Sequence, residues 1–438
     1  MASVVQTSKE VKSRFRTSQR LQASSCRRTN PYQVDRRGLR FTVLTSTRNL
    51  GVDLFSVAII AQLHAHPLLY STDNVYLPAF QIPDIKNKAS VEHLQVLANK
   101  AEGHCTTTSS FINLNHNRAL SSFAQKSRGQ TIMSRFNHKG FFVATFTPLK
   151  ENGDINPDAV PQYVDHLVRN KITGVFVNGT AGEGLSMTVK ERKAMAEAWV
   201  KNCEGKLKTI IHCGAVCIRD AKEMAEHAQS IGADAIAAVP SFYFPPKTVD
   251  ALVEGVKEIA AAAPKLPFLY YHIPRMTHVD LDMSAFLQIG KEKIPTLSGM
   301  KYSGFDLAGA LKCTANHGKE FEIMWGRDDV LLGALAVGLT SFIGSSYSFT
   351  APLALRIVEA FEAGDLQKAK DAQSQLKRTM DATEKYGDQV SAFKAAACMH
   401  GLPLGPTRLP LRALDVKEAK AFEDGLKKLG YFDWIKEN

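Results

Sequence analysis

The chain has 438 residues, of which 45% are hydrophobic and 22% are charged. This composition is ordinary for a globular protein and excludes collagen, a coiled coil and a wholly disordered chain. No apolar run approaches the ~18 residues of a membrane-spanning helix. Seven cysteines without a CxxC pair fit a reducing compartment and argue against a disulfide framework and a zinc site.

The net charge of +11 is concentrated in the N-terminal part of the chain. Residues 1–132 contain 17 Lys or Arg and 7 Asp or Glu, whereas residues 133–438 contain 37 and 36. A balanced body argues against binding of nucleic acid or another polyanion as the main function.

Residues 1–50 are rich in Ser and Thr and contain eleven Lys or Arg, with only Glu10 and Asp35 as acids. This is the composition of a mitochondrial transit peptide, although no long amphipathic stripe accompanies it. The following residues, to 132, show no repeat and no sustained period. We predict that residues 1–132 are a basic extension, either disordered, targeting, or the product of a mispredicted start upstream of Met133. A cytoplasmic location is the default expectation, and a mitochondrial one is the alternative.

From Gly140 onward, short β-rich runs alternate with amphipathic helices, a pattern typical of βα units and a parallel sheet. Eight such units in about 225 residues match a (β/α)8 TIM barrel. An open doubly wound sheet is the alternative, but the even spacing favours closure. The predicted strands are 141–146, 174–177, 209–212, 235–239, 267–271, 296–301, 321–325 and 340–344.

Helix signals separate the predicted strands. Asn156 followed by Pro157 predicts the start of the first helix, and Thr188 with Glu191 forms a capping box before the second. Additional helices are expected at 365–386, 390–399 and 416–429. Residues 133–438 therefore read as one barrel domain with extra C-terminal helices from about 365.

Barrel enzymes place their chemistry at the C-terminal ends of the strands. After the second strand, Gly179-Thr-Ala-Gly-Glu-Gly184 can turn its N–H groups toward one carboxylate or phosphate. The segment has neither the P-loop ending nor the Rossmann spacing. On this evidence alone, an ordinary βα turn fits as well.

A lysine, Lys301, closes the sixth predicted strand. Desolvation there would favour the neutral amine that Schiff-base chemistry needs, although a solvated lysine is the simpler reading. A tyrosine at the end of the fifth strand could relay the proton, which favours the catalytic interpretation. The seventh and eighth strands end in Gly326-Arg-Asp-Asp329 and Gly344-Ser-Ser-Tyr347, which suit a polyhydroxylated ligand or form ordinary polar turns.

A set of spaced motifs carries a family resemblance over residues 141–436, about two-thirds of the chain. The motifs are Thr145-Phe-Thr-Pro148, Asn152-Gly153, Phe176-Val-Asn-Gly-Thr180, Gly182-Glu-Gly-Leu-Ser186, Tyr271-His-Ile-Pro274, Gly299-Met-Lys-Tyr-Ser303 and Gly401-Leu-Pro-Leu-Gly-Pro406. Together they resemble the N-acetylneuraminate lyase and dihydrodipicolinate synthase superfamily of pyruvate-dependent class I aldolases, and are most similar to the animal-type lyases. Residues 1–132 have no counterpart in this resemblance.

The resemblance implies roles for individual residues. Lys301 would be the Schiff-base lysine and Tyr271 the proton-transferring tyrosine, and Thr180 with Ala181 would hold the pyruvate carboxylate. The positions that match contacts to the sugar-derived part of the substrate are Ser303, Gly326, Asp328, Asp329, Gly344 and Ser345. Tyr243 matches an aromatic residue near a neighbouring subunit's site. The resemblance further implies a homotetramer, cleavage of N-acetylneuraminate to N-acetylmannosamine and pyruvate, and no metal or organic cofactor.

Some positions depart from the family pattern. Ala181 replaces a Thr or Ser, Asp329 replaces a Glu, and His278 stands where Gly is common. Synthases bind their second, anionic substrate with an Arg at the position of Met276, and we expect Arg275, one residue earlier, to point differently unless a loop shift brings it into that place. The alternatives are therefore a related aldolase or synthase with another aldehyde, and a barrel that binds sialic acid without turnover.

Overall fold

The protein is described by a computed structural model, which covers residues 44–45, 57–58, 136 and 138–436. The chain divides into two units, residues 1–125 and 126–438. In the first unit, β1 (Leu44–Thr45) pairs antiparallel with β2 (Val57–Ala58). Apart from these two strands, the predicted extension of residues 1–132 lies outside the described residues, so its nature remains a prediction.

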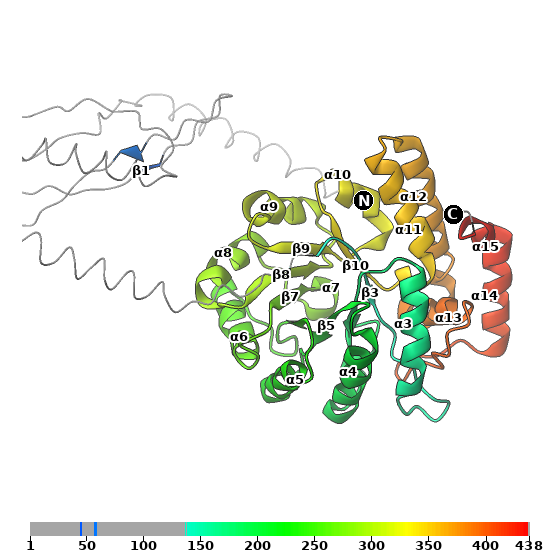
Figure 1. The fold of residues 1–438 in the computed structure, drawn as a ribbon, viewed down its shortest axis with the longest axis horizontal. Coiled ribbons are helices and arrows are strands. Elements are labelled where there is room, and N and C mark those ends of the chain that lie inside the picture. Colours follow the sequence, from blue (N-terminus) through cyan, green and yellow to red (C-terminus); the bar gives the residue numbers. More distant parts are fainter. Residues whose placement is uncertain (1–43, 46–56, 59–135, 137, 437–438) are drawn as a thin grey trace, which may run out of the picture. The chain divides into compact units, whose positions relative to one another are not determined.

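The second unit is built on a closed barrel of eight parallel strands (Figure 1). The barrel closes where β10 pairs with β3, with Phe342 opposite Phe141. This closure confirms the predicted (β/α)8 fold and contradicts the open-sheet alternative. The strands are β3 (Gly140–Ala144), β4 (Gly174–Val177), β5 (Lys208–His212), β6 (Ala235–Ala238), β7 (Phe268–His272), β8 (Leu297–Tyr302), β9 (Glu322–Trp325) and β10 (Ser341–Gly344).

Helices connect successive strands and cover the outside of the barrel (Figure 1). The capping box of Thr188 and Glu191 starts α4 as predicted. Asn156 instead precedes a 3-10 turn, η2 (Pro157–Ala159), makes no side-chain cap bond, and α3 begins only at Val160. The connecting helices are α3 (Val160–Arg169), α4 (Val189–Cys203), α5 (Ile218–Ser230), α6 (Val249–Ala261), α7 (Pro274–Thr277), α8 (Met283–Lys293), α9 (Leu307–His317), α10 (Leu331–Ala336) and α11 (Tyr347–Glu362).

Further helices follow the eighth unit: α12 (Leu366–Asp381), η5 (Glu384–Tyr386), α13 (Gln389–Cys398), α14 (Val416–Leu429) and α15 (Tyr431–Trp434). The prediction for residues 365–386 was one helix, but α12 ends at Asp381. Gly387, whose φ is +92°, then turns the chain toward α13. Figure 1 shows α12 and α13 beside α11, on the side of the barrel where β10 meets β3.

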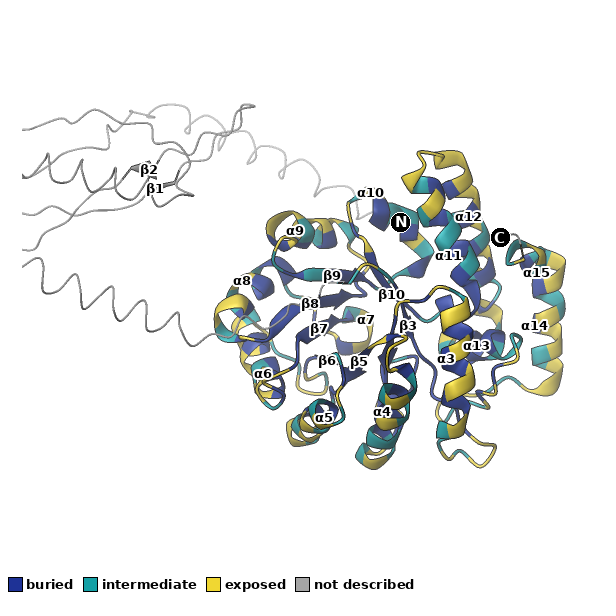
Figure 2. Ribbon diagram, in the orientation of Figure 1, coloured by how far each residue is buried: buried dark blue, intermediate teal, exposed yellow. Residues whose placement is uncertain are grey.

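The core follows the layered pattern expected of a barrel. Every residue of β4, β6, β7 and β8 is buried, and the connecting helices bury one face and expose the other (Figure 2). Strands buried on both faces can position side chains rigidly inside the barrel. Within the described part of the chain, no helix has both the length and the apolar character needed to cross a bilayer.

Candidate active site

Lys301 and Tyr271 lie side by side inside the barrel. They are register partners on β8 and β7, so both side chains point to the same face. Lys301 is 4% exposed, and its Nζ lies 4.2 Å from the centroid of the Tyr271 ring and 4.1 Å from that of Phe176. The preceding tyrosine, Tyr270, points outward and packs on Phe286 of α8. Strand alternation thus selects Tyr271 as the partner of the lysine.

The turn at residues 178–184, here called the β4 turn, reaches the same point. The hydroxyl groups of Thr180 and Tyr271 lie 3.3 Å apart. Thr147 donates a hydrogen bond of 2.5 Å to the carbonyl of Gly182, which ties the turn to the segment after β3. Ala181 is buried beside Thr180. The turn, the tyrosine and the lysine therefore form one contiguous group.

These residues line a cavity of about 420 Å³ at the C-terminal ends of the strands. The predicted residues that line it are Thr180, Ala181, Tyr271, Lys301, Ser303, Gly326, Asp328, Asp329, Gly344 and Ser345. Tyr243 does not line it. That residue is 73% exposed, in the loop after β6, with its ring 5.0 Å from the ring of Phe244. Its predicted contact with a neighbouring subunit remains a prediction.

Two of the lining residues are glycines because polar side chains crowd them. A Cβ on Gly326 would lie 2.0 Å from Oγ of Ser303, and a Cβ on Gly344 would lie 1.9 Å from Oδ1 of Asp328. No side chain fits at either position without displacing a neighbour. The glycines therefore bring Ser303 and Asp328 close to the backbone of adjacent strands.

Asp328 is buried at the end of β9. Its Oδ2 accepts hydrogen bonds from the amide of Ser346 at 3.2 Å and from the hydroxyl of Ser346 at 2.5 Å. Burial raises the pKa of Asp328, and the bonds from Ser346 oppose that shift. Within the described residues its Oδ1 has no hydrogen-bond partner. The carboxyl group mainly fixes the loop after β10.

The structure modifies the expectation for Asp329. Its carboxylate is held by the Arg327 guanidinium through bonds of 3.0 Å and 2.5 Å, and that guanidinium stacks on Phe305 at 3.9 Å from the ring centroid. Bidentate pairing of this kind fixes a carboxylate in one orientation. Asp329 thus lines the cavity as part of an ion pair with Arg327. The short aspartate side chain allows this pairing with an Arg only two residues earlier.

Arg275 faces the cavity, which is the outcome that we expected only with a shift of the loop. Arg275 lines the cavity and donates a 3.3 Å hydrogen bond to Oε1 of Gln389. Met276, at the position compared with the synthases, is 54% exposed and outside the cavity lining. The short helix α7 turns the backbone within this segment, so the neighbouring position faces the cavity. His278, which ends α7, adopts the left-handed conformation with φ of +54°, as a Gly would at that point.

The remaining lining of the cavity comes from α12, η5 and α13, which do not lie at the ends of strands and were not predicted as part of the site. We call these residues the helical wall: Lys377, Met380, Asp381, Thr383, Glu384, Gly387, Gln389, Val390 and Phe393. They follow the last strand by more than 30 residues and carry no recognisable motif. The helical period of α12 and α13 predicts buried faces, but nothing in it shows that part of such a face meets a cavity.

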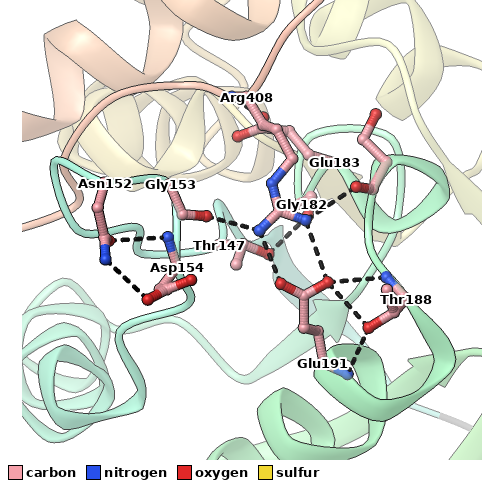
Figure 3. A network of polar contacts seen from close by, with 10 residues as sticks. Thr147, Asn152, Gly153, Asp154, Gly182, Glu183, Thr188, Glu191 and Arg408 are labelled. Atoms are coloured by element: carbon pink, nitrogen blue, oxygen red, sulfur yellow. Dashed lines mark hydrogen bonds and ion pairs between the residues drawn. The ribbon is translucent and has the colours of Figure 1, made fainter.

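Arg408 holds the outer side of the β4 turn (Figure 3). Its guanidinium donates to both carboxylate oxygens of Glu191, at 2.7 Å and 3.1 Å, and to the carbonyl groups of Gly153 and Ser186. This pairing lowers the pKa of Glu191 to about 2. The chain segment between α13 and α14 is thereby joined to the loops after β3 and β4.

No group of three or more His, Cys, Asp or Glu side chains in the described part of the chain is arranged to hold a metal ion. Residues 137–429 match the family model described as the dihydrodipicolinate synthetase family. The N-acetylneuraminate lyase of Rattus norvegicus is 40% identical over 300 residues, which cover 68% of this chain and 94% of that protein.

Two further comparisons agree. The N-acetylneuraminate lyase A of Xenopus laevis is 44% identical over 276 residues, covering 62% of this chain and 90% of its own. The solved structure of the Proteus mirabilis N-acetylneuraminate lyase superposes with a TM-score of 0.66 at 35% identity, covering 68% of this chain and 100% of that one.

Proposed function

The chain belongs to the dihydrodipicolinate synthetase family, and we propose on that basis that it is a class I aldolase that cleaves N-acetylneuraminate to N-acetylmannosamine and pyruvate. One observation carries the assignment of the reacting groups. A buried lysine, Lys301, lies in register with Tyr271 inside a cavity that can hold a sugar acid. Both the residue types and their placement suit imine chemistry.

Lys301 would supply the electron sink. Its amine bonds to the 2-oxo carbon of the open-chain sugar acid, and the keto oxygen leaves as water. When the C3–C4 bond breaks, its electron pair moves to the iminium and leaves an enamine on the lysine. Protonation of C3 and hydrolysis then release pyruvate and restore the amine.

Tyr271 would accept the proton of the C4 hydroxyl group as the bond breaks, and the 3.3 Å contact with Thr180 keeps its hydroxyl near the β4 turn. The amides of Thr180 and Ala181 would bind the substrate carboxylate. The remaining strand-end residues would contact the sugar-derived part, namely Ser303, Gly326, Asp328, Asp329, Gly344 and Ser345. This mechanism requires no metal or organic cofactor.

The proposal extends to assembly and location. A homotetramer would place the exposed pair Tyr243 and Phe244 against another subunit, where large apolar side chains are stabilised by burial. We also propose a cytoplasmic location, with a mitochondrial one as the alternative. Light scattering and imaging of the full chain and of a chain starting at Met133 test these two points.

The experiment on the reaction itself has two parts. Borohydride reduction in the presence of pyruvate should add the pyruvate-derived group to the peptide that contains Lys301. The absence of an adduct would favour a barrel that binds sialic acid without turnover.

The second part tests the substrate. It compares kcat/KM for pyruvate release from N-acetylneuraminate with kcat/KM for condensation of pyruvate and aspartate semialdehyde. Because Arg275 supplies a cation in the cavity, the synthase reaction is the relevant competitor. The lyase assignment requires the first value to be larger, and a larger second value would refute it.

A further inference from the structure

The β4 turn is held in a conformation that its residues do not favour. Asn178 and Glu183, near its two ends, have φ of +60° and +54°. Residues other than glycine seldom adopt such angles, so surrounding contacts must hold them in place. Thr180 and Ala181 lie between these two residues, and the direction of their amides depends on both.

The Glu183 end is fixed by a buried ion pair with α13. Nζ of Lys394 lies 3.1 Å from Oε1 of Glu183, and the two side chains are 2% and 1% exposed. Oε2 of Glu183 also accepts a 2.6 Å bond from the amide of Arg408, and Lys394 donates to the carbonyl of Pro406 at 2.6 Å. Figure 3 shows Glu183 beside the Arg408 network. Each carboxylate oxygen of Glu183 therefore has its own donor.

The Asn178 end is fixed from inside the barrel. The carbonyl of Asn178 lies 3.0 Å from Nδ1 of His212, and its side-chain amide donates to the carbonyl of Arg192 at 2.8 Å. Since the amide of Val239 donates to Nε2 of His212 at 3.3 Å, Nδ1 carries the proton and donates to Asn178. The His212 ring packs perpendicular to the Tyr271 ring, with centroids 5.7 Å apart. This end thus belongs to the rigid barrel.

A buried ion pair is a costly way to stabilise a fold, because two charges must leave water. Burial lowers the pKa of Lys394, and the Glu183 carboxylate opposes that shift. An apolar pair of the same volume would leave the amide of Arg408 and the carbonyl of Pro406 without these partners. The ion pair therefore provides a directional contact between α13 and the turn. On the same helix, Phe393 lines the cavity.

We propose that Glu183 and Lys394 are positioning residues that orient the amides of Thr180 and Ala181 toward the substrate carboxylate. This inference rests on the proposed function of that pair of amides. The ion pair would transmit the position of α13, and with it the helical wall, to the carboxylate site. Neither residue needs to touch the substrate.

The test uses the full chain with Glu183→Gln and Lys394→Met, singly and together. Glu183→Gln preserves shape and remains informative should Lys394→Met fail to fold. The first measurement is the pyruvate concentration that gives half-maximal borohydride trapping on Lys301. The second is trapping with acetone, a carbonyl compound without a carboxylate.

We expect the half-saturating pyruvate concentration to rise roughly 10-fold or more, because displaced amides lose the carboxylate, while acetone trapping changes little. The KM for N-acetylneuraminate should rise with it, and kcat should change by less than about 3-fold. Unchanged pyruvate saturation, or an equal loss with pyruvate and acetone, would overturn the proposal.

Two control variants separate positioning from general stability. Leu426→Ala removes a buried side chain of α14 away from the turn, and Lys208→Met breaks the 2.6 Å contact with Asp234 at the start of β5. Both should leave pyruvate saturation unchanged even where the melting temperature falls. An equal rise in these controls would overturn the positioning role. If the unaltered protein forms no pyruvate adduct, the proposed function fails instead, before any variant is compared.

Discussion

The strand ends and the helical wall face the same cavity but differ in how firmly the fold holds them. Lys301, Tyr271 and Ser303 are 4%, 3% and 6% exposed. Lys301 and Tyr271 sit on strands bonded on both sides, and Ser303 directly follows β8. Across the cavity, Lys377 and Glu384 are exposed side chains on α12 and η5. The comparison indicates that the barrel fixes the groups proposed to react, whereas the wall bounds the rest of the cavity.

The two parts of the cavity also differ in polarity. The lining near Lys301 is buried and aromatic, whereas charged side chains line the rest. Lys301 is buried at the base of the cavity, and its Nζ lies against the rings of Phe176 and Tyr271. In the same lining, Arg327 and Lys377 form ion pairs with Asp329 and Asp381, and Arg275 bonds to Gln389. Imine chemistry benefits from the first environment, and recognition of a polar sugar benefits from the second.

The largest effect is expected for Lys301→Met, which keeps the length of the side chain but removes the amine. We expect loss of both the borohydride adduct and turnover to background, because among the described residues no other lysine lies beside Tyr271 in the cavity. Mass spectrometry of reduced, digested protein checks this. An adduct on Lys377, the second lysine in the lining, would break the comparison by placing the reacting amine on the helical wall.

Tyr271→Phe should have the next largest effect. The ring and its contacts with Phe176 and His212 remain, but the hydroxyl group proposed to take the proton is lost. We expect kcat to fall roughly 100-fold or more while the imine with pyruvate still forms. Tyr270→Phe is the matched control, because that side chain lies on the other face of β7 and packs on Phe286. Near-normal turnover of Tyr271→Phe would remove this residue from the mechanism.

The strand ends could be predicted from the sequence, whereas the helical wall could not. Short β-rich runs and the capping box of α4 depend on neighbours in the chain, and they predict the eight strands within one or two residues. Barrel geometry then placed the strand ends together. The position of α13 depends on packing against α11 and on the turn at Gly387, which no local pattern encodes. For the same reason the sequence left the direction of the Arg275 side chain open, because it depends on the short helix α7.

Arg275→Met tests whether the part of the cavity next to the helical wall contributes to substrate binding. Its guanidinium bonds to Gln389 of the helical wall and has further donors for substrate hydroxyl groups. We expect the KM for N-acetylneuraminate to rise by a factor of about 3 to 10, the loss of one or two hydrogen bonds, with pyruvate trapping unchanged. Steady-state kinetics check this, with Met276→Ala as the neighbouring control outside the cavity. A fall in pyruvate trapping would show that the wall also controls the imine step.

Acid should destabilise both regions through buried neutral histidines. Burial lowers the pKa of His272, in the barrel, and of His400, after α13, to about 4 in each case. Because these values lie below the usual 6.5, the unfolded chain binds more protons between pH 6.5 and 4. Stability is therefore complete above about pH 6.5 and falls as the pH drops toward 4.

Calorimetry between pH 7.5 and 4.5 should show the melting temperature falling by several degrees. His400→Gln can keep a donor to Tyr431 without a titrating group and should flatten the profile. If the melting temperature of His400→Gln falls with pH as steeply as that of the unaltered chain, His400 does not contribute to the acid sensitivity.

The smallest effect is expected from removing residues 1–132. The barrel needs Phe136, which is 4% exposed with its ring 5.9 Å from that of Phe142, and the carbonyl of His138, which accepts a 2.5 Å bond from Ser341. A chain starting at Met133 retains both and should keep kcat/KM within about 2-fold. A chain starting at Gly140 lacks both, and burial of one Phe alone contributes about 2 kcal/mol, so its melting temperature should fall. If the Met133 chain is insoluble while the full chain is active, then the strand ends and the helical wall depend on a third region, and the comparison between two regions is incomplete.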